Sequence, residues 1–297
     1  VGMLRSLAAL VSSFAVVPSF AGSAPQDPVV LQQLRTAAAA APLVVAHRGA
    51  SEQFPENTLA ALRAAVAQHA HVVEFDVWQT KDGAWVLLHD ATLDRTTDAV
   101  ARLGRKDVRV DQCTLAEVRG LDAGAWKGKA FAGEKVPTLA EALAAVPPAI
   151  AMVEHKGGDA RALAAELKKL DANTRVLVQS FDWAWLTAFH AAAPDVLCGA
   201  LGGKDCSPER LVAAAATGAR LVHWDHRTLD LEAAAAVRAA GQLLCVYTVD
   251  PDCMLLGAAA LGCDLITTNR PERLVALRER GELARVRPAS VRATAPR

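Results

Sequence analysis

The sequence lacks an excess of charge of either sign. Its 297 residues include 32 lysines and arginines against 32 aspartates and glutamates, and the pI is near 7.2. Binding to nucleic acid through counterion release needs a broadly basic surface. The balance therefore predicts no nucleic-acid partner, and an anionic substrate would have to be attracted by a local group of cations.

Several ligand-binding motifs are also missing. The sequence has neither a P-loop nor a GxGxxG fingerprint, which argues against a nucleotide-driven reaction. Its six cysteines form no C-x-x-C pair and have no companion histidines at the spacing of a structural zinc site. We expect buried thiols or disulfides; if the protein is exported, Cys198 with Cys206 and Cys245 with Cys263 are candidate pairs among several.

The first two dozen residues are typical of a targeting segment. Arg5 precedes an apolar stretch from Leu7 to Val17, and the small residues at 21–24 offer a cleavage site. Residues 1–24 therefore predict a signal peptide and an exported protein, periplasmic or secreted; the alternative is a buried helix and a cytoplasmic protein. Serines and a proline interrupt the run, which falls short of the about 20 apolar residues of a membrane span. We expect no stable membrane insertion, and the true start residue stays open.

The chain does contain a regular alternation of short apolar runs and longer segments of helical periodicity. Strand character is found at Leu43–Ala46, Val72–Val77, Ala149–Val153, Arg175–Gln179, Val196–Leu201, Arg220–His223, Leu243–Val249 and Asp264–Thr267. Helical character is found at Asn57–Gln68, Leu139–Ala145, Ala160–Leu170, Trp183–Ala192, Pro208–Thr217, Leu229–Ala240, Asp252–Ala260 and Pro271–Arg280. Eight such units predict an α/β fold, a closed (β/α)8 TIM barrel over residues 43–280.

One region breaks this alternation. Trp78–Thr80, a turn at Asp82–Gly83 and Ala84–His89 predict a hairpin, and a polar stretch without a full βα unit follows. We interpret residues from about 90 to 137 as a small insertion after the second strand. Active sites of such barrels form in the βα loops, so we expect the insertion to cover the substrate. We predict that residues 281–297 form a flexible tail.

Charged residues gather at the ends of the predicted strands. Strand alternation points Glu74 and Asp76 to the same face, and Glu154 with Lys156 repeats this arrangement on the next strand. Carboxylates that face one another repel unless a cation lies between them, and three can hold a hard divalent ion through oxygen. The alternative is a network in which Arg48 and Lys156 neutralise the carboxylates.

Two histidines accompany these acids. His47 follows the first predicted strand, and His89 follows the hairpin. Cleavage of a phosphate diester needs a base for the attacking oxygen and an acid for the departing one, and histidine serves both near neutral pH. We predict His47 and His89 as the catalytic pair, with Arg48 and Lys156 binding the phosphate oxygens.

Other polar residues are assigned by their place along the chain. Asn57 is predicted to be the N-cap of the first helix, and Glu56 could reach the site. His223 and His226 follow the sixth predicted strand, where they could face the pocket or simply pack at the rim.

The ordered motifs resemble those of the glycerophosphodiester phosphodiesterase family. The matching segments are His47-Arg48-Gly49, Pro55-Glu56-Asn57-Thr58, Glu74-Phe75-Asp76, Asp82-Gly83, His89-Asp90, Arg95-Thr96-Thr97, Val136-Pro137-Thr138-Leu139, Glu154-x-Lys156 and Gln179-Ser180-Phe181. The resemblance implies a TIM-barrel hydrolase that splits glycerophosphodiesters into sn-glycerol 3-phosphate and an alcohol. It also implies one Ca2+ or Mg2+ ion held by the three carboxylates, the two histidines as the acid/base pair, and the two cations on the phosphate.

The chain departs from the family pattern late in the sequence. Tyr247-Thr248-Val249-Asp250 stands where Trp-Thr-x-Asn is common, and Thr268-Asn269-Arg270-Pro271 stands where Thr-Asp-x-Pro is common. His155 occupies a place that is usually uncharged. These departures bear on which alcohol is accepted more than on the reaction. The expected pocket residues are Gln179, Phe181, Trp224 and Tyr247.

Two rival functions stay open. A phospholipase D-like hydrolase of lysophospholipids or sphingomyelin would use the same scaffold, but the insertion shows no long apolar or basic amphipathic stretch for docking on a bilayer. A periplasmic phosphodiester-binding protein without catalytic activity would have no use for two histidines and three carboxylates together. The sequence is silent on the oligomeric state and on the choice of ion.

Overall fold

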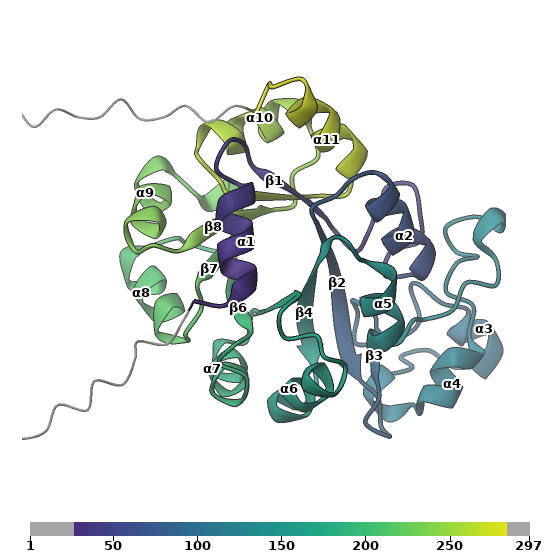
Figure 1. Cartoon of the computed structure of the whole chain (residues 1–297). Helices are drawn as coiled ribbons and strands as arrows, with labels where there is room; N and C mark the ends of the chain where they lie inside the picture. Colours follow the sequence, from purple (N-terminus) through teal and green to yellow (C-terminus); the bar gives the residue numbers. More distant parts are fainter. Residues whose placement is uncertain (1–26, 284–297) are drawn as a thin grey trace, which may run out of the picture.

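The computed structural model describes residues 27–283 of the chain. Within that range eight parallel strands form a ring: β1 (Leu43–Ala46), β2 (Val72–Gln79), β4 (Ile150–Gly157), β5 (Val176–Ser180), β6 (Leu197–Gly202), β7 (Leu221–Asp225), β8 (Leu243–Tyr247) and β9 (Leu265–Thr268). The ring is closed because β1 pairs with β9 on one side and with β2 on the other. The predicted (β/α)8 barrel is confirmed (Figure 1).

Helices surround the ring and alternate with its strands (Figure 1). They are α2 (Leu59–Ala67), α5 (Leu139–Ala145), α6 (Ala160–Lys169), α7 (Trp183–Ala192), α8 (Pro208–Ala216), α9 (Leu231–Ala239), α10 (Asp252–Ala260) and α11 (Pro271–Glu279). Side chains that alternate outward from the strands, such as Phe75 and Val153, pack against buried helix residues such as Leu143 and Leu163. This layer is the main hydrophobic core.

The inward-facing side chains divide the barrel interior into an apolar end and a polar end. Near the amino-terminal ends of the strands they are apolar, as at Leu43, Met152 and Leu177, and form a second buried cluster. Toward the carboxyl-terminal ends the inward positions carry polar groups, as at Glu74 and Gln179. Because parallel strands end at the same rim, the polar groups of separate strands meet there.

One helix that the sequence did not predict lies at the apolar end of the barrel. Helix α1 (Val29–Ala37) spans nine residues and lies across this end of the ring (Figure 1). Its buried residues Val30, Leu31 and Leu34 belong to the same cluster as the inward-facing apolar residues of the strands. The helix therefore closes the end of the barrel opposite the polar rim.

The predicted hairpin and insertion follow β2. Strand β3 (Trp85–Leu87) pairs antiparallel with β2, which confirms the hairpin. The residues after it form two short α-helices, α3 (Ala99–Leu103) and α4 (Leu115–Gly120), and the 3-10 turns Val110–Gln112 and Lys129–Phe131. Buried apolar side chains from this segment form a third cluster, separate from the barrel cores. The insertion therefore has a small hydrophobic core of its own.

Some predictions fall outside the described residues or are corrected by them. The predicted signal peptide lies outside the described range, as does the tail beyond Leu283; Leu283 itself is fully buried, so the predicted tail began too early. Neither candidate disulfide forms, because every cysteine carries an unlinked thiol. Among residues 27–283 no helix has the length and apolar character needed to cross a membrane.

Candidate active site

Two consecutive residues with left-handed backbone follow β1 and turn the chain toward the site. Arg48 has φ 55° and Gly49 has φ 82°. The turn aims the backbone N–H of Arg48 at Glu74, to which it donates a hydrogen bond of 2.8 Å. A Cβ atom on Gly49 would lie 2.5 Å from the backbone of Ala61, so only glycine fits here.

Three carboxylates lie together at the polar rim. Glu74 and Asp76 point inward from β2, and Glu154 points inward from β4, where it stands beside Asp76 in the strand register. Each offers an oxygen within 4.8 Å of the others, and all three side chains are buried. The prediction that alternation brings these residues to one face is confirmed.

The same carboxylates hold oxygen atoms without hydrogen bonds. Oε1 of Glu74 is buried without a partner, whereas Oδ1 of Asp76 and Oε1 of Glu154 are buried and are approached only by the ammonium of Lys156. A buried oxygen of a carboxylate is costly unless it is paired with a positive charge. Three buried carboxylates that face one another, with one ammonium shared by two of them, are a donor set that fits a hard divalent cation.

The pKa values of the three acids show that they compete for positive charge. Burial, and then repulsion from Asp76, raises the pKa of Glu154 to about 7. Burial raises the pKa of Glu74 well above its usual range, helped by both neighbouring carboxylates. Burial also opposes ionisation of Asp76, but Lys156 and Arg48 outweigh it and lower that pKa. If all three acids were ionised, the cluster would carry more negative charge than Arg48 and Lys156 neutralise.

Two cations line the same space. The Nε atom of Arg48 lies 3.2 Å from Asp76, and its Nη1 donates to Glu56 over 2.7 Å. The ammonium of Lys156 lies 3.3 Å from Asp76 and pairs with Glu154. The ion-paired network considered from the sequence is present, and Glu56 does reach the site.

The two predicted catalytic histidines each bond through Nδ1. His47 lies 2.7 Å from the Oδ1 of Asn269, and burial, then Arg48, lowers its pKa to about 4. His89 lies 2.6 Å from Asp90, and burial lowers its pKa as well. Both imidazoles are therefore neutral near pH 7 and can accept a proton.

A chain of charged groups connects the insertion to the barrel beside His89. Arg95 donates to Asp90 over 2.6 Å and to both oxygens of Glu56, over 2.8 and 2.9 Å. Because Asp90 holds His89 and Glu56 holds Arg48, one guanidinium supports residues from both parts of the site.

These side chains surround a cavity of about 230 Å3 at the polar rim. Its lining residues are His47, Arg48, Glu74, His89, Glu154, Lys156, Gln179, Phe181, Leu201, His223, Tyr247, Thr248 and Thr267. Both histidines, both cations and two of the three carboxylates predicted from the sequence therefore face one space. The third carboxylate, Asp76, lies buried beside it.

The wall opposite the carboxylates combines polar and aromatic side chains. His223 bridges Gln179 at 2.7 Å and Thr267 at 3.0 Å, and burial lowers its pKa to about 3. Phe181 is 52% exposed at the mouth and meets Tyr247 edge to face. Of the two histidines left open by the sequence, His223 lines the cavity and His226 does not.

Trp224 was expected in this pocket, and the structure corrects that prediction. His223 precedes it on β7 and points inward, so alternation turns Trp224 outward. Its side chain is fully buried in the layer between strands and helices, against Gly202, where a Cβ atom would come within 2.1 Å of the indole.

Asn57 was predicted to cap a helix, and its role is different. Thr58 is the N-cap of α2 and accepts from Ala61. Asn57 has φ 57° and exchanges two hydrogen bonds with Asp76, donating from Nδ2 over 2.8 Å and accepting from the backbone N–H over 3.1 Å. The Glu56-Asn57 pair before the helix could have indicated a role for Asn57 at the site. From the sequence alone, however, an N-cap role explained the asparagine equally well.

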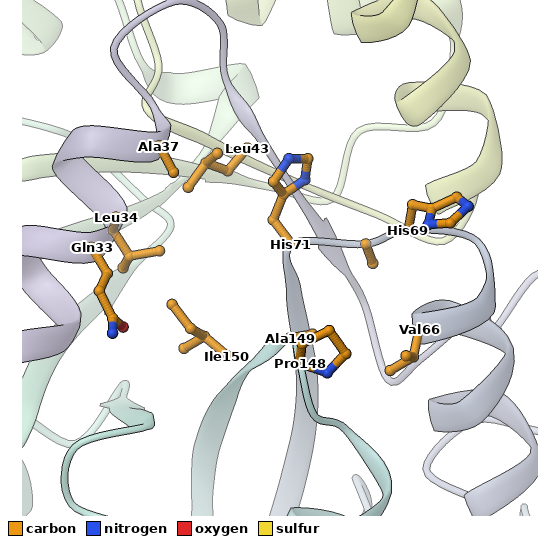
Figure 2. A pocket seen from close by; sticks show the side chains of 11 residues that line it. Gln33, Leu34, Ala37, Leu43, Val66, His69, His71, Pro148, Ala149 and Ile150 are labelled. Atoms are coloured by element: carbon orange, nitrogen blue, oxygen red, sulfur yellow. The ribbon is translucent and has the colours of Figure 1, made fainter.

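A larger cavity, about 440 Å3, lies at the other end of the barrel between α1 and α2 (Figure 2). Its lining includes Leu34, Leu43 and Ile150, with Gln33, His69 and His71 as polar members. No carboxylate, lysine or arginine is among the residues that line it. Size alone would favour this cavity, but the chemistry of the smaller one supports catalysis.

The fold and the polar rim define the class of barrel enzymes that hydrolyse phosphate diesters. A family profile described as the glycerophosphoryl diester phosphodiesterase family matches residues 47–273. The chain belongs to this family, whose members are phosphoric diester hydrolases.

Individual relatives cover most of the chain. A glycerophosphodiester phosphodiesterase of Caldanaerobacter subterraneus is 33% identical over 248 residues, covering 80% of this chain and 98% of the relative. One of Bacillus subtilis is 31% identical and covers 77% of this chain and 84% of the relative.

A solved structure extends the likeness to the fold. A phosphodiesterase of Oleispira antarctica, in complex with the product sn-glycerol 3-phosphate, superposes with a TM-score of 0.73 at 27% identity. The alignment covers 80% of this chain and 97% of that one.

Proposed function

We propose that this protein catalyses the metal-dependent hydrolysis of glycerophosphodiesters to sn-glycerol 3-phosphate and an alcohol. The observation that carries the proposal is the cluster of three buried carboxylates, with Oε1 of Glu74 unpartnered, beside two cations and two neutral histidines at one cavity. The names of the relatives support the substrate class, and the product bound in the Oleispira enzyme supports the product.

Glu74, Asp76 and Glu154 would hold one divalent cation, Ca2+ or Mg2+, since both bind carboxylate oxygen. When bound, the ion acts as a Lewis acid on a phosphate oxygen and offsets the surplus negative charge of the carboxylates. Asn57 keeps the Asp76 carboxylate in place through its Nδ2 hydrogen bond. Arg48 does so for Glu74 through its backbone N–H.

Arg48 and Lys156 bind the non-bridging oxygens of the substrate phosphate. Both line the cavity, and their side chains are only 16% exposed, so their charge is weakly screened by water. As the reaction proceeds, negative charge builds on those oxygens, and fixed cations stabilise it more than they stabilise the ground state.

His47 and His89 form the acid/base pair. One accepts a proton from the attacking oxygen as the new P–O bond forms, and the other donates a proton to the alcohol oxygen as the old P–O bond breaks. Both imidazoles are neutral near pH 7, which suits the base; the acid must take up its proton before the bond breaks. Attack by water and attack by a substrate hydroxyl both fit this pair.

Metal removal tests the proposal. We expect chelation to abolish cleavage of glycerophosphocholine or glycerophosphoethanolamine, and added Ca2+ or Mg2+ to restore it. Glu74→Gln should weaken metal binding measured by calorimetry. His47→Ala should bind the metal normally yet lose turnover. Full activity in excess chelator, or undiminished activity of His47→Ala, would contradict the mechanism.

Substrate choice separates the proposal from the rival lipase activity. A soluble glycerophosphodiester fits a cavity of about 230 Å3, whereas an acyl chain would have to extend beyond it. We expect turnover of glycerophosphocholine to exceed turnover of lysophospholipid or sphingomyelin vesicles. The reverse order would favour the phospholipase D-like function. Tight binding without turnover of either would favour a binding protein.

A further inference from the structure

The end of β9 carries an asparagine that contacts His47 and that no part of the reaction has yet used. Residues 46 and 268 are partners in the pairing of β1 with β9, and the backbone N–H of His47 donates to the carbonyl of Thr268 over 2.9 Å. This pairing places Asn269 beside His47, with 2.7 Å between Oδ1 and Nδ1. The contact is fixed by the barrel itself.

A carboxylate from the neighbouring strand determines which end of the Asn269 amide faces His47. Asp250 follows β8 and accepts from the Nδ2 of Asn269 over 2.7 Å. It also accepts from the backbone N–H of Asn269 over 2.8 Å and from the hydroxyl of Thr268 over 2.9 Å. A carboxylate only accepts, so the NH2 end of the amide must face Asp250 and the carbonyl end must face His47. Ser51 donates to the same Oδ1 over 3.0 Å, which agrees with this orientation.

The orientation of the amide determines the tautomer of the imidazole. A carbonyl oxygen accepts and cannot donate, so Nδ1 of His47 must carry the hydrogen. A neutral imidazole with hydrogen on Nδ1 has its lone pair on Nε2, and Nε2 is then the atom that can take a proton from a reacting group.

We propose that Asn269, oriented by Asp250, is a positioning residue that fixes His47 in the tautomer with hydrogen on Nδ1 and a lone pair on Nε2. The proposal rests on the proposed role of His47 as an acid/base group. It differs from a direct His-carboxylate pair because an amide separates the negative charge of Asp250 from the ring.

Because charged groups surround His47, the separation of Asp250 from the ring affects the pKa of this histidine. Arg48 adjoins it on the chain, while Asp76, Glu56 and Asp250 provide negative charge nearby, and His223 lies neutral on the interior wall. With a neutral amide in contact, burial and Arg48 prevail and the pKa of His47 falls to about 4. A carboxylate in direct contact would favour the imidazolium form and raise that pKa.

Nitrogen NMR of protein labelled at histidine, in the metal-loaded state, tests the tautomer directly. We expect Nδ1 of His47 to be the protonated ring nitrogen at pH 7, and Asn269→Ala to give a mixture of tautomers. Asn173→Ala is the matched control, because Asn173 also donates its amide to a carboxylate, Asp195, over 2.9 Å but lies between α6 and β5, away from the polar rim. A wild-type His47 protonated at Nε2 would overturn the proposal.

Kinetics test the consequence for catalysis. Asn269→Ala should lower kcat by roughly 10- to 100-fold with little change in KM, because the imidazole of His47 is no longer held in one tautomer while the binding groups remain. The exchange variant Asp250→Asn with Asn269→Asp keeps one amide and one carboxylate but puts the charge against His47. It should recover most of kcat and move the acid limb of the kcat/KM profile upward by about one pH unit.

The two readouts keep this proposal separate from the proposed function. The expected tautomer in the wild type, lost in Asn269→Ala, supports the positioning role even if no diester is cleaved. An unchanged tautomer in Asn269→Ala, or an exchange variant with an unshifted pH profile, would overturn it even in a fully active enzyme.

Discussion

Glu74 and Asp76 are two residues apart on β2, and that spacing decides which side of the barrel they face. Alternation along a strand is a local property, so the sequence predicts the shared face of these acids, and of Glu154 with Lys156. Asn57 and Asn269 were harder to assign, because their roles depend on backbone turns and on partners brought from other strands. Local pattern predicts the cluster of carboxylates but not the groups that orient them.

The raised pKa of Glu154 leads to a prediction about stability in the absence of metal. Its pKa is about 7 in the folded protein against an ordinary value of 4.5, so the folded state binds more protons between these values. The free energy of unfolding should therefore fall as the pH rises through this window, by up to about 3 kcal/mol. Glu154→Gln should remove much of that fall in chelated protein, measured by urea denaturation at several pH values.

An exposed glutamate provides the control for this experiment. Glu209→Gln lies at an exposed position of α8 and should leave the pH dependence as in the wild type. A metal-free wild type whose stability is unchanged between pH 5 and 8 would show that burial and repulsion from Asp76 do not raise the pKa of Glu154 as described.

Gly49 gives a second prediction at this scale. Gly49→Ala should destabilise the fold by about 2–4 kcal/mol, because the backbone is left-handed there and a Cβ atom would meet the backbone of Ala61 at 2.5 Å. Gly104→Ala is the matched control: φ is 64° but nothing lies within 4 Å, so the cost should be about 1 kcal/mol. Equal losses in the two variants, measured by denaturation, would show that close packing at Gly49 is unimportant.

The strands of the barrel were all predicted from the sequence, with bounds that differ by at most two residues except at β4. Apolar runs of four to eight residues between helical segments identify buried parallel strands. The largest difference is at β4, which continues beyond Val153 to Gly157 because charged residues there face a polar interior and not solvent. Helix α1 was missed because it is short and because it covers the end of the barrel. A local sequence pattern does not reveal such a role, since it depends on the closed ring of strands.

The role of α1 can be tested separately from the site. Leu34 is 1% exposed and packs with the apolar end of the barrel, so Leu34→Ala should lower the free energy of unfolding by about 3 kcal/mol while kcat and KM stay unchanged. Val29→Ala, on the same helix but 50% exposed, should cost less than about 0.5 kcal/mol. A large loss of kcat in Leu34→Ala without loss of stability would contradict the assignment of α1 to the fold.

At the scale of the whole molecule, the groups that stabilise the fold and the groups proposed for catalysis lie at opposite ends of the barrel axis. The apolar cluster and α1 occupy one end, and the carboxylates, cations and histidines occupy the other. Balanced overall charge is compatible with an anionic substrate because Arg48 and Lys156 are concentrated at the polar rim. The insertion adds Arg95 to this rim and connects the support of His89 to that of Arg48.

Product analysis of one reaction tests the central claim most directly. Phosphorus NMR would follow glycerophosphocholine with the metal-loaded protein, with His47→Ala and chelated protein as controls. The account predicts that the diester signal is replaced by that of sn-glycerol 3-phosphate, in an amount equal to the choline released, and that neither control converts it. Release of phosphocholine and glycerol, or no conversion by folded protein with either Ca2+ or Mg2+, would contradict it.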